Sequence, residues 1–377
     1  MLVVFMRRRD MLALLCGALV TACAAGGDSV VLSNLALPHD TSGAPLITGE
    51  TSVVAVNGTY YFYVNDWGGC ADVDCCPSPG GCADCCYVPS TPAYPDPCVF
   101  AGNHSVHVYA TEDLATWRHL GVALSPAHRA AGVEFRPHVV FNERTARYVM
   151  WYEDRPSAIV SPGYAVATAA QPEGPFLTVA QAVAVADVPG DFDVLVDADG
   201  AAWHVQTTTN DPNATRGFVV TALDESFTAP AVPRRAASFV APKPAEGPVL
   251  FRRPGHGYYI LGGTTCCACR GGASIYVFRA PSPLGPWRFV GDIGSNPPRT
   301  PNATFDPHSP DSYSTRAQAS AVFEAPPGSD QWVWLGNQWV TSGARNSGLL
   351  YWFVIDFDGS GDPRQVVFAP NATVRGL

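Results

Sequence analysis

One short pattern recurs five times along this chain and constrains its fold more than any other feature. Each copy is an apolar stretch, a turn that usually carries glycine, and a strand rich in aromatic residues. The five turns lie at Asn57-Gly58, 142–147, Asp199-Gly200, Pro254-Gly255 and Pro327-Gly328. The aromatic strands that follow them span residues 60–63, 148–152, 203–205, 258–261 and 332–334. A repeat of roughly 40 to 80 residues built only of short strands and turns is typical of a propeller blade. The five copies therefore predict a five-bladed β-propeller.

A second pattern follows most of these copies and extends each blade. It is a small alternating strand followed by a turn into an aromatic residue, at 108–110 with Trp117, at 165–167 with Phe176, and at 276–280 with Trp287. Weaker copies lie at 219–222 and 353–357. The 35 Gly and 34 Pro disfavour long helices, because proline removes a helical donor and glycine costs helix entropy. The chain is therefore expected to be all-β.

The repeats run from about residue 47 to 370 with no Ser/Gly linker or charge run between them. We therefore expect residues 26–377 to form one propeller domain, although the length alone would allow two domains. Cysteine-rich insertions interrupt the repeats at 68–98 and 264–270. The net charge of -10 and the lack of a basic patch argue against nucleic acid or an anionic membrane as partner.

The first residues have the pattern of a targeting segment. Arg7-Arg8-Arg9 precede an apolar run at 11–20, and Ala22-Cys23-Ala24 is a small-x-small cleavage site. This predicts a secretory signal peptide over residues 1–25. The apolar run is too short to span a membrane, so no membrane insertion is expected. An alternative is a bacterial lipoprotein signal at 20–23, which would leave the protein anchored at a lipidated Cys23.

Five N-glycosylation sequons favour the secreted alternative. They lie at Asn57, Asn103, Asn213, Asn302 and Asn371. Glycosylation would place these residues on the surface of a eukaryotic secreted glycoprotein.

Cysteine usage also indicates an oxidising compartment. Of the 12 cysteines, Cys16 and Cys23 lie in the targeting segment and ten remain. Seven of the ten form one cluster, which consists of Cys70, Cys75, Cys76, Cys82, Cys85, Cys86 and Cys98. The second cluster consists of Cys266, Cys267 and Cys269. We expect disulfides, with at least one between the clusters if all ten pair, since both clusters are odd. The alternative is a zinc site, because Cys82 and Cys85 have ligand spacing.

The residues that open each blade are the candidate functional residues. In a propeller the innermost strands line a central channel, so their first residues meet around one mouth. Counting back from the aromatic strands, these openers are Glu50, the run 134–136, Asp191, Glu246 and Gln318. Carboxylates crowded into a cleft push their pKa values apart, which supplies one acid and one base for hydrolysis. The alternative for each carboxylate alone is a solvated strand end.

Several of these segments resemble a known enzyme family. The stretches DFDVLVDADG at 191–200 and EGPVLF at 246–251 resemble two signature blades of glycoside hydrolase family 43. The stretch FRPHVVFN at 135–142, Trp151, the PLGPW turn at 283–287 and Ala317-Gln318 are similar to its exo-β-1,3-galactanase-like branch. The likeness covers about residues 38–340. It implies a five-bladed propeller of inverting glycosidases. We expect no cofactor and no metal.

The resemblance also implies roles for individual residues. Glu246, which opens a Glu-x-Pro strand, is the expected general acid, and Asp191 is expected to orient this acid and modulate its pKa. Most members carry an aspartate base at the start of the first blade, where this chain has Glu50. The galactanase-like branch uses a glutamine on the last blade instead, which Gln318 matches. Either Glu50 or Gln318 is therefore expected to act as base or to position the water.

The sequence departs from that branch at one more position. The branch has a glutamate before its Arg-Pro pair, where this chain has Phe135, and Glu134 is displaced by one residue. A shift of one residue turns a strand side chain to the opposite face, so Glu134 is not expected to reach the mouth of the channel. The residues expected to contact substrate are Arg136, Trp151, Asn337 and Trp339.

Two classes of function follow from these residues. The first is a secreted, monomeric glycoside hydrolase acting on β-1,3-galactan or arabinogalactan-like side chains of a poly- or oligosaccharide, with an arabinofuranosidase or β-xylosidase of the same family as a variant. The second is a catalytically inactive, carbohydrate-binding propeller that keeps Asp191 and Glu246 as ligand contacts. A usable base in the funnel separates the two classes.

Overall fold

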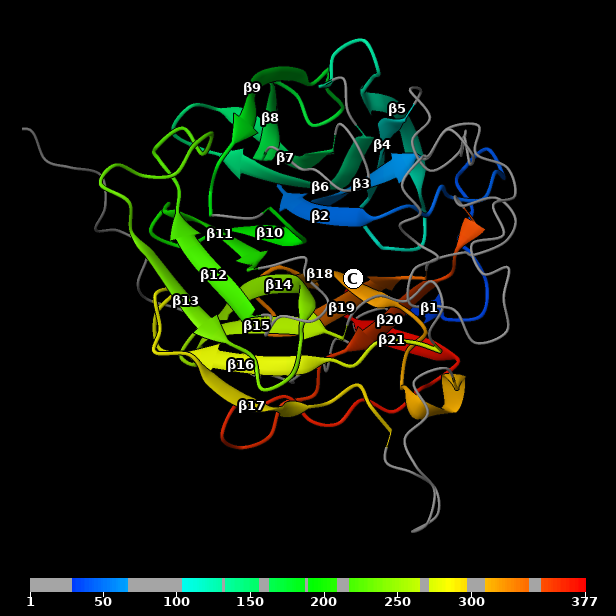
Figure 1. Ribbon diagram of the computed structural model, residues 1–377. Coiled ribbons are helices and arrows are strands. Elements are labelled where there is room, and N and C mark those ends of the chain that lie inside the picture. The colour runs from blue at the N-terminus through cyan, green and yellow to red at the C-terminus, as the bar shows by residue number, and fades with distance from the viewer. Residues whose placement is uncertain are drawn as a thin grey trace, which may run out of the picture.

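The computed structural model of the chain describes residues 29–66, 104–130, 133–155, 163–186, 189–208, 217–264, 271–296, 309–338 and 347–377. In these ranges the chain forms five antiparallel sheets around a common centre (Figure 1). The first strand of each sheet contacts the first strands of both neighbouring sheets, in the closed order β2, β6, β10, β14, β18 and back to β2. The predicted all-β, five-bladed propeller is confirmed.

The blades are numbered here in chain order, and four of them have four strands. Blade 1 consists of β2 (Thr51–Val56), β3 (Thr59–Asp66), β4 (Ser105–Thr111) and β5 (Arg118–Leu124). Blade 2 consists of β6 (Val133–Asn142), β7 (Arg147–Arg155), β8 (Gly163–Ala169) and β9 (Leu177–Val183). Blade 3 consists of β10 (Phe192–Val196), β11 (Ala202–Thr207), β12 (Gly217–Ala222) and β13 (Ala236–Val240). Blade 4 consists of β14 (Glu246–Arg253), β15 (Gly257–Gly263), β16 (Tyr276–Ala280) and β17 (Arg288–Asp292).

Each of the five predicted turns joins the first and second strands of a blade. In blade 1 the strands pair Val56 with Thr59, so Asn57-Gly58 is a two-residue hairpin turn. Both turn residues have positive φ, 51° and 82°. This is the conformation of a type I′ turn, for which Asn-Gly is the favoured pair because glycine has no Cβ and asparagine tolerates the left-handed region. The position of this turn follows from its local sequence.

Blade 5 is built differently from the others. It has three strands, β18 (Gln318–Glu324), β19 (Trp332–Asn337) and β20 (Leu350–Val354), and a 3₁₀ turn η2 (Pro310–Ser312) precedes them. The expected strand at 353–357 is therefore misplaced, because the ladder to β19 pairs 350–354. Beside β20 lies a ribbon of β1 (Ser29–Ser33) and β21 (Asn371–Arg375), which pairs the two ends of the described chain.

Asn34 attaches this ribbon to the propeller. Its side-chain amide nitrogen donates to the backbone oxygen of Trp352 at 3.0 Å, and its side-chain oxygen accepts from the Trp352 backbone N–H at 2.7 Å. The side-chain amide of Asn34 thus pairs with the Trp352 backbone as a neighbouring strand would. Its nitrogen and its oxygen are both hydrogen-bonded although they are buried. Sequences more than 300 residues apart are joined at this point.

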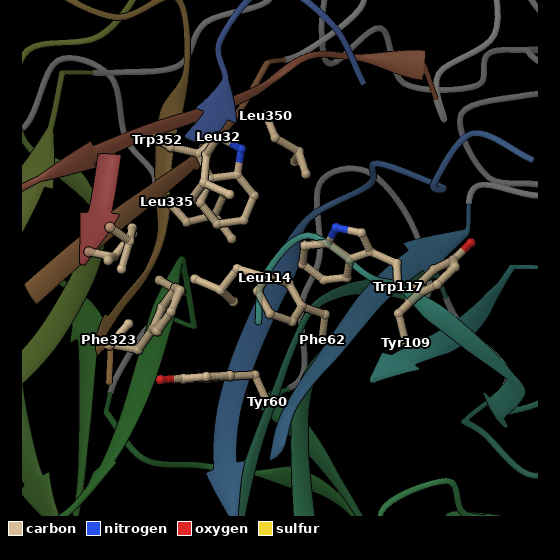
Figure 2. Packing of buried hydrophobic residues seen from close by; sticks show 14 of the residues in the cluster. Leu32, Tyr60, Phe62, Tyr109, Leu114, Trp117, Phe323, Leu335, Leu350 and Trp352 are labelled. Atoms are coloured by element: carbon tan, nitrogen blue, oxygen red, sulfur yellow. The ribbon is translucent and has the colours of Figure 1, made fainter. Parts of the chain in front are cut away.

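The apolar core lies between the blades. Between blades 5 and 1, Phe62 packs edge-on against Trp117 with ring centroids 4.5 Å apart, and Phe323 and Trp352 complete the aromatic group (Figure 2). Leu32 of the terminal ribbon joins the same cluster. Such edge-to-face contacts add to the stabilisation from buried apolar area. The blades are therefore rigidly packed sheets that hold their inner ends in place.

Several expected features lie outside the described residues. These are the signal segment, the ten cysteines expected to form disulfides, Asn103, Asn213, Asn302 and Trp339. Two sequons can be placed, and the side chains of Asn57 and Asn371 are both exposed. In the part of the chain that is described, no helix has the length and apolarity needed to cross a membrane.

Candidate functional site

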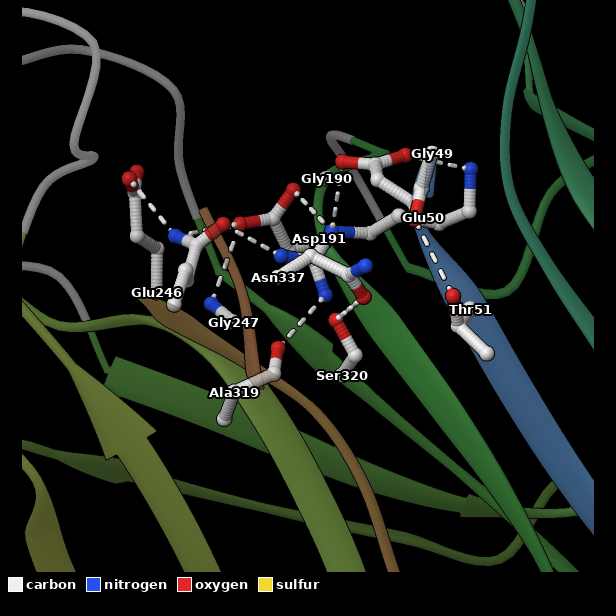
Figure 3. Close-up of polar contacts among 12 residues, drawn as sticks. Gly49, Glu50, Thr51, Gly190, Asp191, Glu246, Gly247, Ala319, Ser320 and Asn337 are labelled. Atoms are coloured by element: carbon white, nitrogen blue, oxygen red, sulfur yellow. Dashed lines mark hydrogen bonds and ion pairs between the residues drawn. The ribbon is translucent and has the colours of Figure 1, made fainter. Parts of the chain in front are cut away.

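The structure brings the blade openers together at one end of the propeller axis. Glu50 immediately precedes β2, Asp191 precedes β10, Glu246 begins β14 and Gln318 begins β18. All of these inner strands run from this end towards the turns at the other end. Figure 3 shows the side chains of Glu50, Asp191 and Glu246 gathered in one region. Four blades therefore contribute one polar group each to the same place.

Arg136 of β6 lies at the centre of this group. Its Nε is 3.0 Å from Oδ1 of Asp191 and 3.4 Å from Oε1 of Glu50. Its backbone N–H donates to Oε2 of Glu50 at 2.7 Å, and its Nη1 donates to the backbone oxygen of Ala319 at 3.4 Å. Its Nη2 also donates to Oε1 of Gln318 in a short hydrogen bond. Blades 1, 3 and 5 thus meet on one guanidinium from blade 2.

Local backbone geometry aims Arg136 at the axis. The register between β6 and β7 is irregular between Phe135 and His138, and Arg136 has a φ of 50°. A bulge of this kind bends a strand and redirects a side chain, and it is common beside active sites. Positive φ is costly for a residue with a long side chain, and its contacts hold it there.

Gln318 connects the arginine to the expected acid. Its Nε2 lies 3.2 Å from Oε1 of Glu246 and 3.4 Å from Oδ2 of Asp191. The backbone N–H of Gly247 donates to the same Asp191 oxygen at 3.0 Å. Asp191 therefore contacts both Arg136 and the start of β14, the strand that carries the acid. This is the geometry expected of a residue that orients a neighbouring acid.

The pKa of Glu50 is strongly shifted. Burial raises it to about 7, the positive charge of Arg136 opposes that rise, and the negative charge of Asp191 adds to it. Burial alone would lower the pKa of Arg136, but the carboxylates of Asp191 and Glu50 outweigh this effect and raise it. A carboxyl group with a pKa near neutral can take up and release a proton under working conditions. The arginine, in contrast, remains charged.

Asn337 and Ser320 form a second layer beside the site. Asn337 ends β19 opposite Gln318, and its Oδ1 accepts from the Ser320 hydroxyl at 2.5 Å (Figure 3). Its Nδ2 is buried and has no hydrogen-bond partner among the described residues. The structure therefore places Asn337 beside the site, and its contact with substrate stays a prediction. Sequence reasoning missed Ser320, although its place two residues after Gln318 was an available signal.

The expectation that Trp151 contacts sugar is wrong. Its side chain is fully buried, and its ring packs against His204 and Tyr164 with centroids 5.2 and 6.1 Å away. Its Nε1 donates to the backbone oxygen of Phe227 at 2.7 Å. The residue faces blade 3 rather than the axis. Phe135, at the place where the related branch has a glutamate, is also buried.

A cavity of about 910 Å³ continues along the axis on the other side of the site. Its lining starts at Ser52, His138 and Asp193, each further along its inner strand than the site residues, and extends to the far turns. His138 Nδ1 lies 2.9 Å from Oδ1 of Asp193 at this level. Within the described ranges, no three His, Cys, Asp or Glu side chains are grouped so as to hold a metal ion.

These observations define a class of protein, a five-bladed propeller with a group of carboxylates around one arginine at the end of its axis. The sequence profile described as "Glycosyl hydrolases family 43" matches residues 84–340, which is more than half of the chain. The chain therefore belongs to glycosyl hydrolase family 43. A comparison with curated proteins finds no match.

Solved structures share the fold. A family 43 β-1,3-galactosidase is similar with a TM-score of 0.68 and 18% identity, over 91% of this chain and 63% of that chain. An exo-β-1,3-galactanase from Phanerochaete chrysosporium, determined with β-1,3-galactotriose, is similar with a TM-score of 0.65 and 20% identity. The similarity covers 91% of this chain and 68% of that chain. An endo-1,4-β-xylanase from Bacteroides thetaiotaomicron is similar with a TM-score of 0.57 and 17% identity, over 87% of this chain and 97% of that chain. The chain thus spans less than two thirds of the first of these structures.

Proposed function

We propose that this protein is a secreted glycosidase that hydrolyses β-1,3-galactan or arabinogalactan-like side chains with inversion at the anomeric carbon. The observation that carries the proposal is the continuous polar chain from Glu246 through Gln318 and Asp191 to Arg136 and Glu50. It holds an acid candidate and a base candidate at the same end of the axis. Perturbed carboxylates with a specific charge partner are typical of catalytic sites.

In this mechanism Glu246 gives its proton to the glycosidic oxygen as the bond from that oxygen to the anomeric carbon breaks. A water attacks the anomeric carbon from the opposite face and passes its proton to Glu50. Inverting glycosidases hold their two groups roughly 6.5–9.5 Å apart to admit this water. Asp191 lies beside Arg136 and orients the start of β14, which carries the acid, through the Gly247 N–H. The two protons balance, so the enzyme returns to its starting state after proton exchange with solvent.

The proposed substrate rests on the similar structures. The β-1,3-galactosidase and the exo-β-1,3-galactanase have the highest fold similarity among those compared above, and the latter was determined with β-1,3-galactotriose. The glutamine that opens the last blade, Gln318, matches the pattern of that branch. The xylanase is less similar, and xylan is therefore the second choice.

A hydrolysis screen tests the proposal. The purified protein is incubated with β-1,3-galactan, arabinogalactan, xylan, arabinan and the corresponding aryl glycosides, and the anomer first released is followed by NMR. We expect galactose of inverted configuration from β-1,3-galactan. Release of the retained anomer would refute the mechanism, and hydrolysis of only xylosides or arabinosides would refute the substrate.

A second candidate function has one observation in its favour. Glu50 is only 6% exposed and both of its carboxyl oxygens face Arg136, an arrangement that also suits a structural ion pair. In that case the protein would bind galactan without cleaving it. Calorimetry with β-1,3-galactotriose separates the two, because a non-catalytic propeller would bind the sugar and leave it intact over days.

Export is part of the proposal. The arginines at 7–9, the apolar run at 11–20 and the small-x-small site at 22–24 favour cleavage near residue 25. The exposed sequons at Asn57 and Asn371 are compatible with glycan attachment. N-terminal sequencing of protein from a eukaryotic culture medium checks the cleavage, and a cell-associated, lipidated Cys23 would support the anchored alternative instead.

A further inference from the structure

We propose that Gln318 is a positioning residue that holds the acid Glu246, and that it does not act as the base. This inference rests on the proposed function, because it assigns a role within the same reaction. It differs from the expectation drawn from the galactanase-like branch, in which the equivalent glutamine serves the attacking water. The argument starts from the three groups that surround the Gln318 amide.

Arginine decides which way this amide points. A guanidinium has only donors, so the Gln318 atom that faces Nη2 of Arg136 must be the carbonyl oxygen. The amide nitrogen must then face the two carboxylates, Oε1 of Glu246 at 3.2 Å and Oδ2 of Asp191 at 3.4 Å. Carboxylates accept hydrogen bonds, so every contact is matched in this orientation. A flipped amide would place donor against donor and acceptor against acceptor.

This orientation is unsuitable for a base. The carbonyl oxygen already accepts a hydrogen bond from the charged guanidinium of Arg136. If this oxygen took a proton from water, its new O–H group would face the N–H donor of Arg136. The imidic acid tautomer of the amide has the same fault, since it places an O–H against the guanidinium. The nitrogen is a donor to two carboxylates and has no lone pair to offer. Gln318 can therefore donate to Glu246 but is poorly placed to remove a proton.

Close packing keeps the amide in place. Gly247, the residue after the acid, has a φ of 60°, and a Cβ there would lie 2.9 Å from Cγ and 3.0 Å from Cδ of Gln318. The glycine therefore leaves the space that the glutamine side chain fills. Gln318 is also buried. A side chain confined on all sides holds its hydrogen-bond partners within the tolerance that proton transfer requires.

Leaving-group dependence distinguishes the two roles. The acid matters most when the leaving oxygen needs a proton, whereas the base matters equally for all leaving groups. We therefore compare Gln318→Leu with the matched variant Glu50→Ala on 2,4-dinitrophenyl β-galactoside and on β-1,3-galactobiose. For Gln318→Leu we expect kcat/KM to fall about 10²-fold on galactobiose and less than about tenfold on the activated substrate. Azide should restore neither rate.

For Glu50→Ala we expect equal losses on both substrates and partial recovery with azide, which can replace the activated water. A pH profile gives a second readout that a structural defect would not change. Loss of a donor to the carboxylate of Glu246 should move the alkaline limb of kcat/KM to higher pH in Gln318→Leu. Gly247→Ala keeps every reacting group but displaces the amide, and it should reproduce the same leaving-group pattern.

Equal losses on the two substrates with azide recovery in Gln318→Leu would overturn the inference. Full activity of Gln318→Glu would also overturn it, since a carboxylate in place of the amide can act as a base but cannot donate to Glu246. A wild-type protein that hydrolyses neither substrate would instead overturn the proposed function itself. The three results are distinguishable because the wild type is measured in the same assay.

Discussion

Removal of the Glu50 carboxyl group should change how stability depends on pH. The pKa of Glu50 is about 7 in the folded protein, mainly because burial disfavours the charged form, and 4.5 is its reference value. The folded protein therefore binds this proton more tightly than the unfolded chain does. Stability should increase as the pH falls from 7 to 4.5 and should decrease as the pH rises through 7. The side chain is nearly fully buried, so solvent screening is small.

The magnitude follows from the two values. A pKa difference of one corresponds to about 1.4 kcal/mol, so the raised pKa of Glu50 makes a contribution of about 3 kcal/mol between pH 4.5 and pH 8. Glu50→Gln removes this titration and keeps the shape of the side chain. We therefore expect the stability of the variant, relative to wild type, to be about 3 kcal/mol more favourable at pH 8 than at pH 4.5.

Urea denaturation at pH 4.5, 6 and 8 measures this difference directly. Glu225→Gln is the matched control, because its carboxyl lies on the surface with a side chain that is 79% exposed. It removes the same kind of carboxyl group, but at an exposed position instead of a buried one. If the difference in unfolding free energy between Glu50→Gln and wild type stays constant across the three pH values, the reasoning is refuted. That result would mean that burial does not shift the pKa of Glu50.

Three further predictions concern other parts of the molecule. Glu246→Gln should lose about 10²–10⁴ in turnover on natural glycan and far less on activated aryl glycosides, with an unchanged melting temperature; undiminished turnover on glycan would end its assignment as the acid. The pKa of His204 is lowered to about 3 by burial, with a smaller effect of His138. Stability should therefore fall as the pH drops from 6.5 towards 3, and His204→Phe should remove about 3 kcal/mol of that loss at pH 4.5, which denaturation of both proteins at pH 7 and 4.5 would show. Mass spectrometry of the non-reduced, secreted protein should find disulfides among the ten cysteines outside the targeting segment, and ten free thiols would contradict this.

Features that depend on a few neighbouring residues could be predicted from the sequence. The Asn57-Gly58 turn forms because these two residue types tolerate positive φ, and this preference is local. The five repeats place Glu50, Asp191, Glu246 and Gln318 at equivalent positions, and equivalent positions in a closed ring must face the same end. Hydrophobic alternation and turn spacing were therefore sufficient for the propeller and for the set of polar residues at its mouth.

Features that depend on contacts between blades were decided only by the tertiary structure. Arg136 reaches the axis through an irregular step in β6, and its partners belong to three other blades that are distant in sequence. Trp151 lies on the face of β7 that packs against blade 3. The alternation of apolar and polar residues along β7 does not reveal which neighbouring blade covers that face. The relative placement of rigid sheets sets such distances, and no local propensity encodes it. The sequence by itself therefore determined which polar residues lie at the mouth of the propeller. The packing of the blades decided which of them form hydrogen bonds and ion pairs, and these contacts set their pKa values.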